Sequence, residues 1–137
     1  MYKKILVPLD GSPVAEQILP EVKELAKLTG AEIQLLRVTL VHVLPGADPT
    51  DKEVIAVREA EKYLEEIQAG LEKEGLNASV HVRYGHDAGE ILDHSQKVDL
   101  VAMCTHGRTG LGRWTLGSVA ERVVRHSGKP VLLVRAA

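Results

Sequence analysis

Apolar residues along this chain follow two alternating patterns. Short runs rich in valine, isoleucine and leucine are separated by longer stretches in which an apolar residue recurs every three or four positions. A short apolar run indicates a strand buried in a sheet, and the longer repeat indicates an amphipathic helix. The short runs predict five strands, over residues 3–10, 32–38, 78–84, 98–104 and 129–135.

The stretch between the first two strands predicts a helix with recognisable ends. Ser12 can cap its amino end, and Pro13 suits the first helical position, where a missing amide hydrogen costs nothing. Gly30 is a natural stop signal. Pro20 falls inside this predicted helix, so we expect a kink there because one backbone hydrogen bond is lost.

Three further helices are each opened by a capping signal. Thr50–Glu53 forms a capping box before a long helix that ends at Gly75. Asp87–Glu90 repeats the spacing before a short helix, and Ser118–Glu121 repeats it before the last one. Helices therefore alternate with strands along the whole chain.

This alternation predicts an α/β fold with a parallel sheet and helices on both of its faces, because each crossover must be right-handed. The length of 137 residues fits one domain, and we expect it to span residues 1–137. In such sheets a ligand lies beyond the carboxyl ends of the strands, where the strand order reverses. The glycine-rich segment after residue 104 leaves the fourth strand, so it lies at that edge.

The composition narrows the function classes. The formal net charge of −2 offers no electrostatic case for binding nucleic acid or an acidic membrane surface. The single cysteine, Cys104, excludes an internal disulfide and suits a reducing compartment. The apolar run near the start is too short for a signal peptide or a membrane span, so we expect a soluble, cytoplasmic protein.

The segment CTHGRTGLGRWTLGSVAER, residues 104–122, resembles two nucleotide-binding motifs without matching either. A phosphate loop needs Lys and Ser or Thr where this chain has Arg113 and Trp114. A dinucleotide fingerprint starting at Gly110 lacks its third glycine, because Thr115 stands there. A phosphate-loop NTPase and a flavin or dinucleotide protein are both disfavoured.

The remaining signal in this segment is physical. Its glycines allow the backbone to approach a ligand closely and to adopt positive φ. Ser118 opens a helix whose first amide groups are unpaired and favour an anion, and Arg108 adds positive charge. From spacing alone, an alternative stays open: Ser118 simply caps its helix, and the segment is an ordinary surface connection.

Four stretches carry a family resemblance: KKILVPLDGS, THGRTGL, LGSVAERV and KPVLLVR. Over nearly its full length the chain resembles the universal stress protein family, whose ATP-binding members carry G-x2-G-x9-G-[ST]. Here Gly107 and Gly117–Ser118 fill the later positions, and Cys104 stands at the first glycine. The resemblance implies a three-layer, Rossmann-like fold of the adenine nucleotide alpha hydrolase type, with a five-stranded parallel sheet in the order 3-2-1-4-5.

The same resemblance implies ATP as the ligand, with or without a bridging Mg²⁺ or Mn²⁺. The adenine and ribose would contact the strand ends, and the phosphates would lie at the start of the last helix. Asp10 has a competing role, since its carboxylate can instead bond the amides of the turn that follows. The expected site residues are Pro8, Asp10, Val38, Met103, Cys104, His106, Gly107, Arg108, Gly110, Gly117, Ser118 and Val119.

The resemblance implies an ATP-binding regulatory protein of the stress response, with at most slow ATP hydrolysis. No positioned base or phosphate-loop lysine is present for fast phosphoryl transfer, and we assign no catalytic residue and no metal ligand. An interaction module of the same fold that binds no nucleotide is the second hypothesis, and Cys104 separates the two. An ATPase or phosphotransfer enzyme is a weaker third.

The last predicted strand indicates that the chain pairs with a second protein chain. The family's topology places it at an edge of the sheet, and an apolar edge is prone to aggregation unless it is covered. Antiparallel pairing with a second copy across a two-fold axis would cover it. We therefore expect a homodimer formed through residues 130–135.

Overall fold

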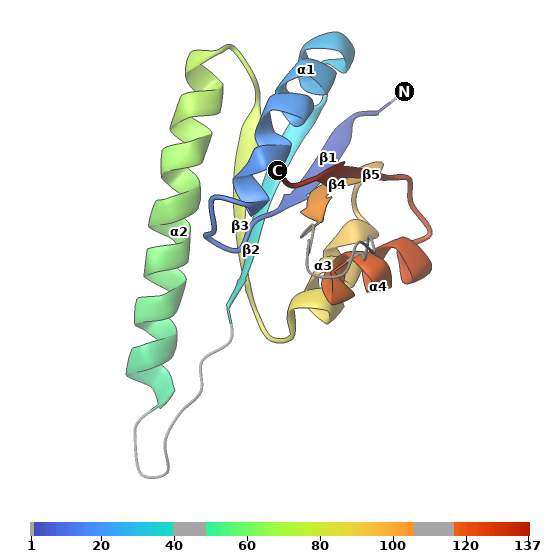
Figure 1. Cartoon of the computed structure of the whole chain (residues 1–137). Helices are drawn as coiled ribbons and strands as arrows, with labels where there is room; N and C mark the ends of the chain where they lie inside the picture. The colour runs from blue at the N-terminus through green and yellow to red at the C-terminus, as the bar shows by residue number, and fades with distance from the viewer. Residues whose placement is uncertain (1, 40–48, 106–116) are drawn as a thin grey trace.

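The computed structural model describes residues 2–39, 49–105 and 117–137, which form a sheet between two layers of helices (Figure 1). The strands are β1 (Lys4–Pro8), β2 (Glu32–Thr39), β3 (Ala78–Tyr84), β4 (Leu100–Thr105) and β5 (Val131–Arg135). All neighbours pair in parallel, in the order β3-β2-β1-β4-β5. The predicted α/β fold and strand order are confirmed.

The helical elements of the described residues are a short 3₁₀ helix, η1 (Ala15–Ile18), and the α-helices α1 (Leu19–Thr29), α2 (Pro49–Lys73), α3 (Asp87–Ser95) and α4 (Ser118–His126). Helices α1 and α2 contribute to the hydrophobic cluster on one face of the sheet, and α3 and α4 to the cluster on the other. Within the described ranges, none of the helices combines the length and the apolar character needed to cross a bilayer.

Each face of the sheet has its own hydrophobic core. Successive side chains of a strand point to opposite faces, so Ile5 and Val7 pack with α1 and α2, while Leu6 packs with α3 and α4. All three residues are completely buried. Because the chain has no phenylalanine, aliphatic side chains fill both cores.

The first predicted helix differs from the observed one at its start. The chain forms η1 first, and α1 begins only at Leu19, so Pro20 lies in the first turn of α1. Amide groups in a first turn have no acceptor inside the helix, so Pro20 removes no hydrogen bond there and the predicted interior kink was wrong. Ser12 instead acts at the entry to η1, where its Oγ accepts the amide of Ala15 at 3.2 Å.

The capping residues were predicted one position too late. His86 and Gly117 are the N-caps of α3 and α4, so Asp87 and Ser118 are the first helical residues, and no side chain caps either helix. The Asp87 carboxylate accepts the amide of Ala88 at 2.7 Å instead. Helix α2 begins at Pro49, one residue before the predicted cap Thr50, whose side chain lies outside the described residues.

The predicted glycine stops are confirmed. Gly30 follows α1 with a φ of 74°, and Gly75 follows α2 by two residues with a φ of 81°. Both values lie in the left-handed region that suits glycine at a helix end. At the end of α2 the amide of Leu76 donates to the carbonyl of Leu71 at 3.1 Å, which closes the helix.

Strand β5 is the edge strand next to β4, and β4 is its only partner among the described residues. It is shorter than predicted, because it begins at Val131 rather than at residue 129. Its first four residues are only half-buried, whereas those of β4 are buried.

Candidate functional site

A cavity of about 340 Å³ opens at the carboxyl ends of the central strands. Its walls come from the ends of β1, β2 and β4, from the amino ends of α3 and α4, and from the turn that precedes η1. Strands β2 and β4 lie on either side of β1, so the strand order reverses here. Both the place and the volume are typical of small-molecule sites in open α/β sheets.

Every predicted site residue that the structure describes lines this cavity. They come from segments far apart in the sequence: Pro8, Asp10, Val38, Met103, Cys104, Gly117, Ser118 and Val119. The other four predicted residues, His106, Gly107, Arg108 and Gly110, lie outside the described residues.

The cavity also has walls that the sequence analysis did not assign to it: Leu9, Val14, Ala15, Leu36, Asp87, Ile91 and Ala120. Most of these are apolar core residues, and nothing in a periodic pattern distinguishes a core residue that also borders a cavity. Asp87 is different, because it closely follows the third strand at the edge where ligands bind. Its spacing to Glu90 led us to interpret it only as a helix cap.

Asp10 both supports its loop and borders the cavity. Its Oδ1 accepts the amide of Ser12 at 2.9 Å and the hydroxyl of Ser12 at 2.5 Å. The turn-capping role considered from the sequence is therefore confirmed. The carboxylate still lines the cavity, so the hydrogen bonds that fix the loop also fix where this negative charge lies.

The loop after β1 contacts the side chain of Arg37, which lies on the α1–α2 side of the sheet. Gly11 has a φ of 87°, and a Cβ at this position would lie 2.8 Å from the guanidinium of Arg37. The guanidinium of Arg37 lies 5.1 Å from the ring centroid of Tyr63, whose hydroxyl donates to Glu16 at 2.8 Å. The positive φ favours glycine at position 11, because other residues rarely adopt this conformation, and an added Cβ would also displace the far end of the Arg37 side chain.

The amino end of α4 borders the cavity through residues 117–120. Gly117 has φ −60° and ψ 151°, which any residue can adopt, so the positive φ allowed for in the sequence analysis is not observed at this glycine. The helix begins where the amide of Glu121 donates to the carbonyl of Gly117 at 2.9 Å. Amides in the first turn have no acceptor inside the helix, and the helix dipole makes this end favourable for an anion.

Cys104 lines the cavity near the carboxyl end of β4 and is half-buried. Burial raises the pKa of its thiol above the ordinary value, so the neutral form is favoured at neutral pH. The side chain is therefore a small apolar group in the wall of the site rather than a reactive thiolate.

The described part of the cavity wall contains two carboxylates, those of Asp10 and Asp87, and no lysine or arginine. Within residues 2–39, 49–105 and 117–137, no group of three or more His, Cys, Asp or Glu side chains could hold a metal ion. These residues do not provide a metal site of their own. A divalent cation would have to enter with a ligand that supplies oxygen atoms.

Comparison with known proteins gives a consistent result. The model of the universal stress protein family matches residues 1–135. Universal stress protein MJ0531 of Methanocaldococcus jannaschii is 34% identical over 141 residues, covering 98% of this chain and 83% of that protein. Universal stress protein YxiE of Bacillus subtilis is 32% identical over 152 residues, covering 98% of this chain and 100% of that protein.

Solved structures share the fold. The structure of MJ0577, also from M. jannaschii, is 35% identical with a TM-score of 0.84, covering all of this chain and 98% of that one. A universal stress protein in complex with cAMP has 20% identity and a TM-score of 0.67, covering 99% and 98% of the two chains. One from Archaeoglobus fulgidus in complex with dAMP has 21% identity and a TM-score of 0.65, covering 96% and 97%. With a family model over nearly the whole chain and relatives aligned along 98% of it, this chain belongs to the universal stress protein family.

Proposed function

We propose that this protein binds ATP in the cavity at the carboxyl ends of β1, β2 and β4 and acts as a regulatory protein of the stress response. The adenosine lies against the strand ends at Pro8, Val38 and Met103, and the phosphates lie at the amino end of α4. A Mg²⁺ or Mn²⁺ ion accompanies the phosphates when it is bound. The single cysteine, which suits a reducing compartment, favours a cytoplasmic location.

One observation carries this proposal. Residues chosen from the sequence for an ATP site, on four separate segments, all border one cavity where they are described. The amino end of α4 supplies unpaired amides for an anion, while the wall around Leu36, Val38 and Ile91 is apolar enough for a purine. The nucleotide complexes of two proteins with this fold, with cAMP and with dAMP, support a nucleotide as the class of ligand.

The nucleotide acts as a ligand rather than as a rapidly consumed substrate. Fast phosphoryl transfer needs a group that positions the nucleophile and cations on the transferred phosphate. The described wall contains no lysine or arginine, and one of its two carboxylates, Asp10, is already hydrogen-bonded to Ser12. We therefore expect slow hydrolysis at most.

Cys104 favours a second candidate, an interaction module that binds no nucleotide. It stands where the family's ATP-binding signature has glycine, and its side chain borders the cavity. Denaturing the purified protein and identifying released small molecules by mass spectrometry, with calorimetric titration by Mg·ATP, separates the two. We expect ATP to be released or to bind with a dissociation constant below the millimolar range. No ATP by either measurement would leave the interaction module as the function.

We also propose a homodimer that forms through residues 130–135. Strand β5 is an edge strand with half-buried apolar residues, and a groove beside it is lined by Leu25, Leu28, Leu132 and their neighbours. Leu28 is 83% exposed in the single chain. Light scattering at micromolar concentration should give the mass of two chains, and a monomer mass would refute this assembly.

A further inference from the structure

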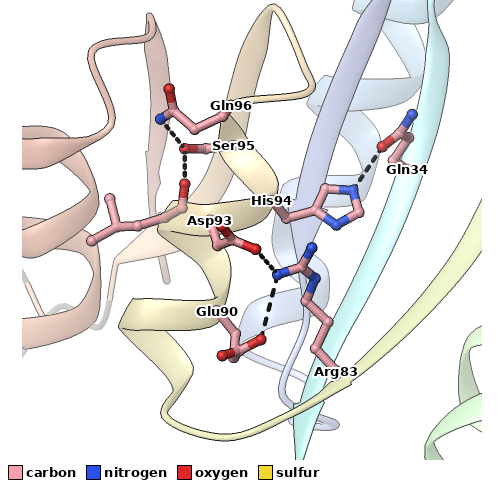
Figure 2. A network of polar contacts seen from close by, with 8 residues as sticks. Gln34, Arg83, Glu90, Asp93, His94, Ser95 and Gln96 are labelled. Carbon is pink, nitrogen blue, oxygen red and sulfur yellow. Dashed lines mark hydrogen bonds and ion pairs between the residues drawn. The ribbon is translucent and has the colours of Figure 1, made fainter.

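Two tethers of polar side chains connect α3 to the sheet. His94, in the last turn of α3, points to β2, where its Nε2 lies 2.8 Å from Oε1 of Gln34 (Figure 2). Arg83 on β3 forms ion pairs with Asp93 and, at 3.4 Å, with Glu90. The first tether is buried, since His94 is only 4% exposed.

The hydrogen bonds around Gln34 show which ring nitrogen of His94 carries a hydrogen. The amide nitrogen of Gln34 donates to Oε1 of Glu32 at 2.8 Å, so the amide oxygen of Gln34 faces the imidazole. That oxygen can only accept, and therefore Nε2 of His94 carries the hydrogen. Nδ1 is buried and has no hydrogen-bond partner, so the ring is neutral, and a second proton would create a buried N–H without an acceptor.

The groups around His94 oppose a positive charge. On β3 it faces His81, whose ring centroid is 4.8 Å away, and Arg83, while Lys97 follows α3. Asp93 acts in the opposite direction, but Arg83 already pairs with it. On β2 the nearest carboxylate, Glu32, accepts from Gln34 and from Ser79 rather than from His94. Burial first, and then the neighbouring His81, Arg83 and Lys97, lower the pKa of His94 to about 4.

His94 and Gln34 each lie within three residues of a residue that lines the cavity, on the same face of the same element. Ile91 lies three residues before His94 on the same face of α3, and Leu36 lies two residues after Gln34 on the same face of β2. Ile91 and Leu36 both line the cavity and share one hydrophobic cluster. Moving α3 away from β2 at His94 would therefore separate these two wall residues.

We propose that the His94–Gln34 contact is an acid-sensitive latch, which holds α3 on β2 and keeps the Ile91–Leu36 wall of the cavity closed. When α3 is released, His94 enters water and takes up a proton, so acid favours the released state. The Arg83–Asp93 ion pair persists at mildly acidic pH, because Arg83 holds the pKa of Asp93 below its ordinary value. Of His94 and Asp93, His94 is therefore the group that responds to mild acid.

The expected size of the effect follows from the two protonation equilibria. His94 in the released helix has an ordinary pKa near 6.5, and in the closed protein about 4. Between pH 7.5 and pH 5.0 the ratio of released to closed α3 therefore rises by at most about 30-fold. Strands β1 and β4, which carry no part of the latch, should not show this change.

Hydrogen exchange measured by mass spectrometry at pH 7.5 and 5.0, corrected for the intrinsic exchange rate, tests the latch. In the wild type, peptides covering α3 should lose about 10- to 30-fold of their protection at pH 5.0, while β1 and β4 keep theirs. His94→Gln, which can still donate to Gln34, should abolish the loss. His126→Gln is the matched control, because His126 is exposed on α4, and it should behave as the wild type does.

Two outcomes of this experiment would overturn the proposal: the same loss in His94→Gln, or a loss spread equally over β1 and β4. If His94→Gln does not fold, nitrogen NMR of the wild type replaces it. The latch requires a neutral His94 with its hydrogen on Nε2 and no titration above pH 5. An ordinary titration near 6.5 for that ring would refute it.

The effect of the latch on the cavity rests on the proposed nucleotide binding, and it is tested separately by adding ATP. Saturating ATP at pH 5.0 should restore the protection of α3 in the wild type, because a ligand of the closed state suppresses release. ATP that binds by calorimetry without restoring protection would overturn the link. ATP that binds at no pH would refute the proposed function instead, and the exchange measured without ATP would still decide the latch.

Discussion

The imidazole rings of His81 and His94 lie edge to face, with centroids 4.8 Å apart, and both are connected to the same oxygen atom of Glu32. His94 reaches that oxygen through Gln34, and His81 reaches it through Ser79, whose Oγ lies 2.8 Å from Nε2 of His81. Ser79 donates its hydrogen to Glu32 at 3.1 Å, so it accepts from His81. Burial lowers the pKa of each ring, so the neutral form of each is favoured at neutral pH.

The first prediction is that stability falls in mild acid. The folded pKa of His94 is about 4, below the unfolded value near 6.5, so the unfolded chain binds more protons between these values. This contribution to stability is fully present above pH 6.5 and is lost as the pH falls toward 4. Between pH 7.5 and 5.0, His94 should lower the free energy of unfolding by at most about 2 kcal/mol.

Urea unfolding at both pH values measures this loss. His94→Gln should remove most of the pH dependence and leave the smaller part that comes from His81. His126→Gln, at an exposed position, should keep the dependence of the wild type. If the free energy of unfolding changed equally between pH 7.5 and 5.0 in the wild type and in His94→Gln, His94 would not be the source of the pH dependence.

The second prediction concerns Gly117. Its φ and ψ suit any residue, so Gly117→Val should fold, with a loss of about 1 kcal/mol because valine is a poor N-cap. The new side chain would enter the proposed phosphate site and should weaken ATP binding by about 10- to 100-fold in calorimetry. Gly70→Val, on the exposed side of α2 with open space around it, is the matched control and should bind normally. Equal affinities for the two variants would refute the phosphate site.

The third prediction uses the single cysteine as a reporter. Because burial raises the pKa of Cys104, the thiol should react slowly with iodoacetamide at pH 7.5, and ATP should slow the reaction further. Mass spectrometry of the whole protein measures the rate of this alkylation directly, since the chain has one cysteine. Alkylation that is as fast with ATP as without it would place the nucleotide elsewhere.

The fourth prediction changes the same residue. Cys104→Gly, which restores the glycine of the family signature, should raise the affinity for ATP several-fold and cost about 1 kcal/mol of stability, because glycine weakens a strand. Cys104→Ser keeps the size of the side chain and should leave the affinity near that of the wild type. A lower affinity in the glycine variant would indicate that the thiol contacts the ligand favourably.

The fifth prediction tests the homodimer. Leu28 is 83% exposed and lines the groove beside β5, so Leu28→Glu should leave the monomer's stability within about 0.5 kcal/mol while it weakens the dimer. Sedimentation velocity at micromolar concentration should then show monomers. Val54→Glu, at a partly exposed position of α2 away from this groove, should remain dimeric.

The sixth prediction is that alanine has opposite effects on stability at two glycines, Gly70 within α2 and Gly75 just after it. Gly70 lies within α2, with nothing within 4 Å of an added Cβ, so Gly70→Ala should stabilise the protein by about 0.5–1 kcal/mol. Gly75 has a φ of 81°, so Gly75→Ala should destabilise it by about 1 kcal/mol. Thermal unfolding of both variants checks the signs, and equal shifts would contradict the role of backbone conformation.

Much of the site was accessible from the sequence because it is built at element ends. Strand ends and helix starts leave signals in a pattern, and the family signature named the residues around Gly117. The exact starts of α1, α3 and α4 were not accessible, since a capping box with a shift of one residue looks the same in sequence. Only the backbone angles of His86 and Gly117 showed which residue precedes each helix.

The sequence by itself determined which strands and helices follow one another along the chain, because hydrophobic periodicity is local and records which faces must be buried. It also determined which segments meet at the carboxyl edge of the sheet. Only the tertiary structure decided that His94 would meet Gln34, 60 positions away, and that His81 would lie beside it. Each of these polar residues is unremarkable in its own segment, and its protonation depends on burial and on partners that three different elements bring together.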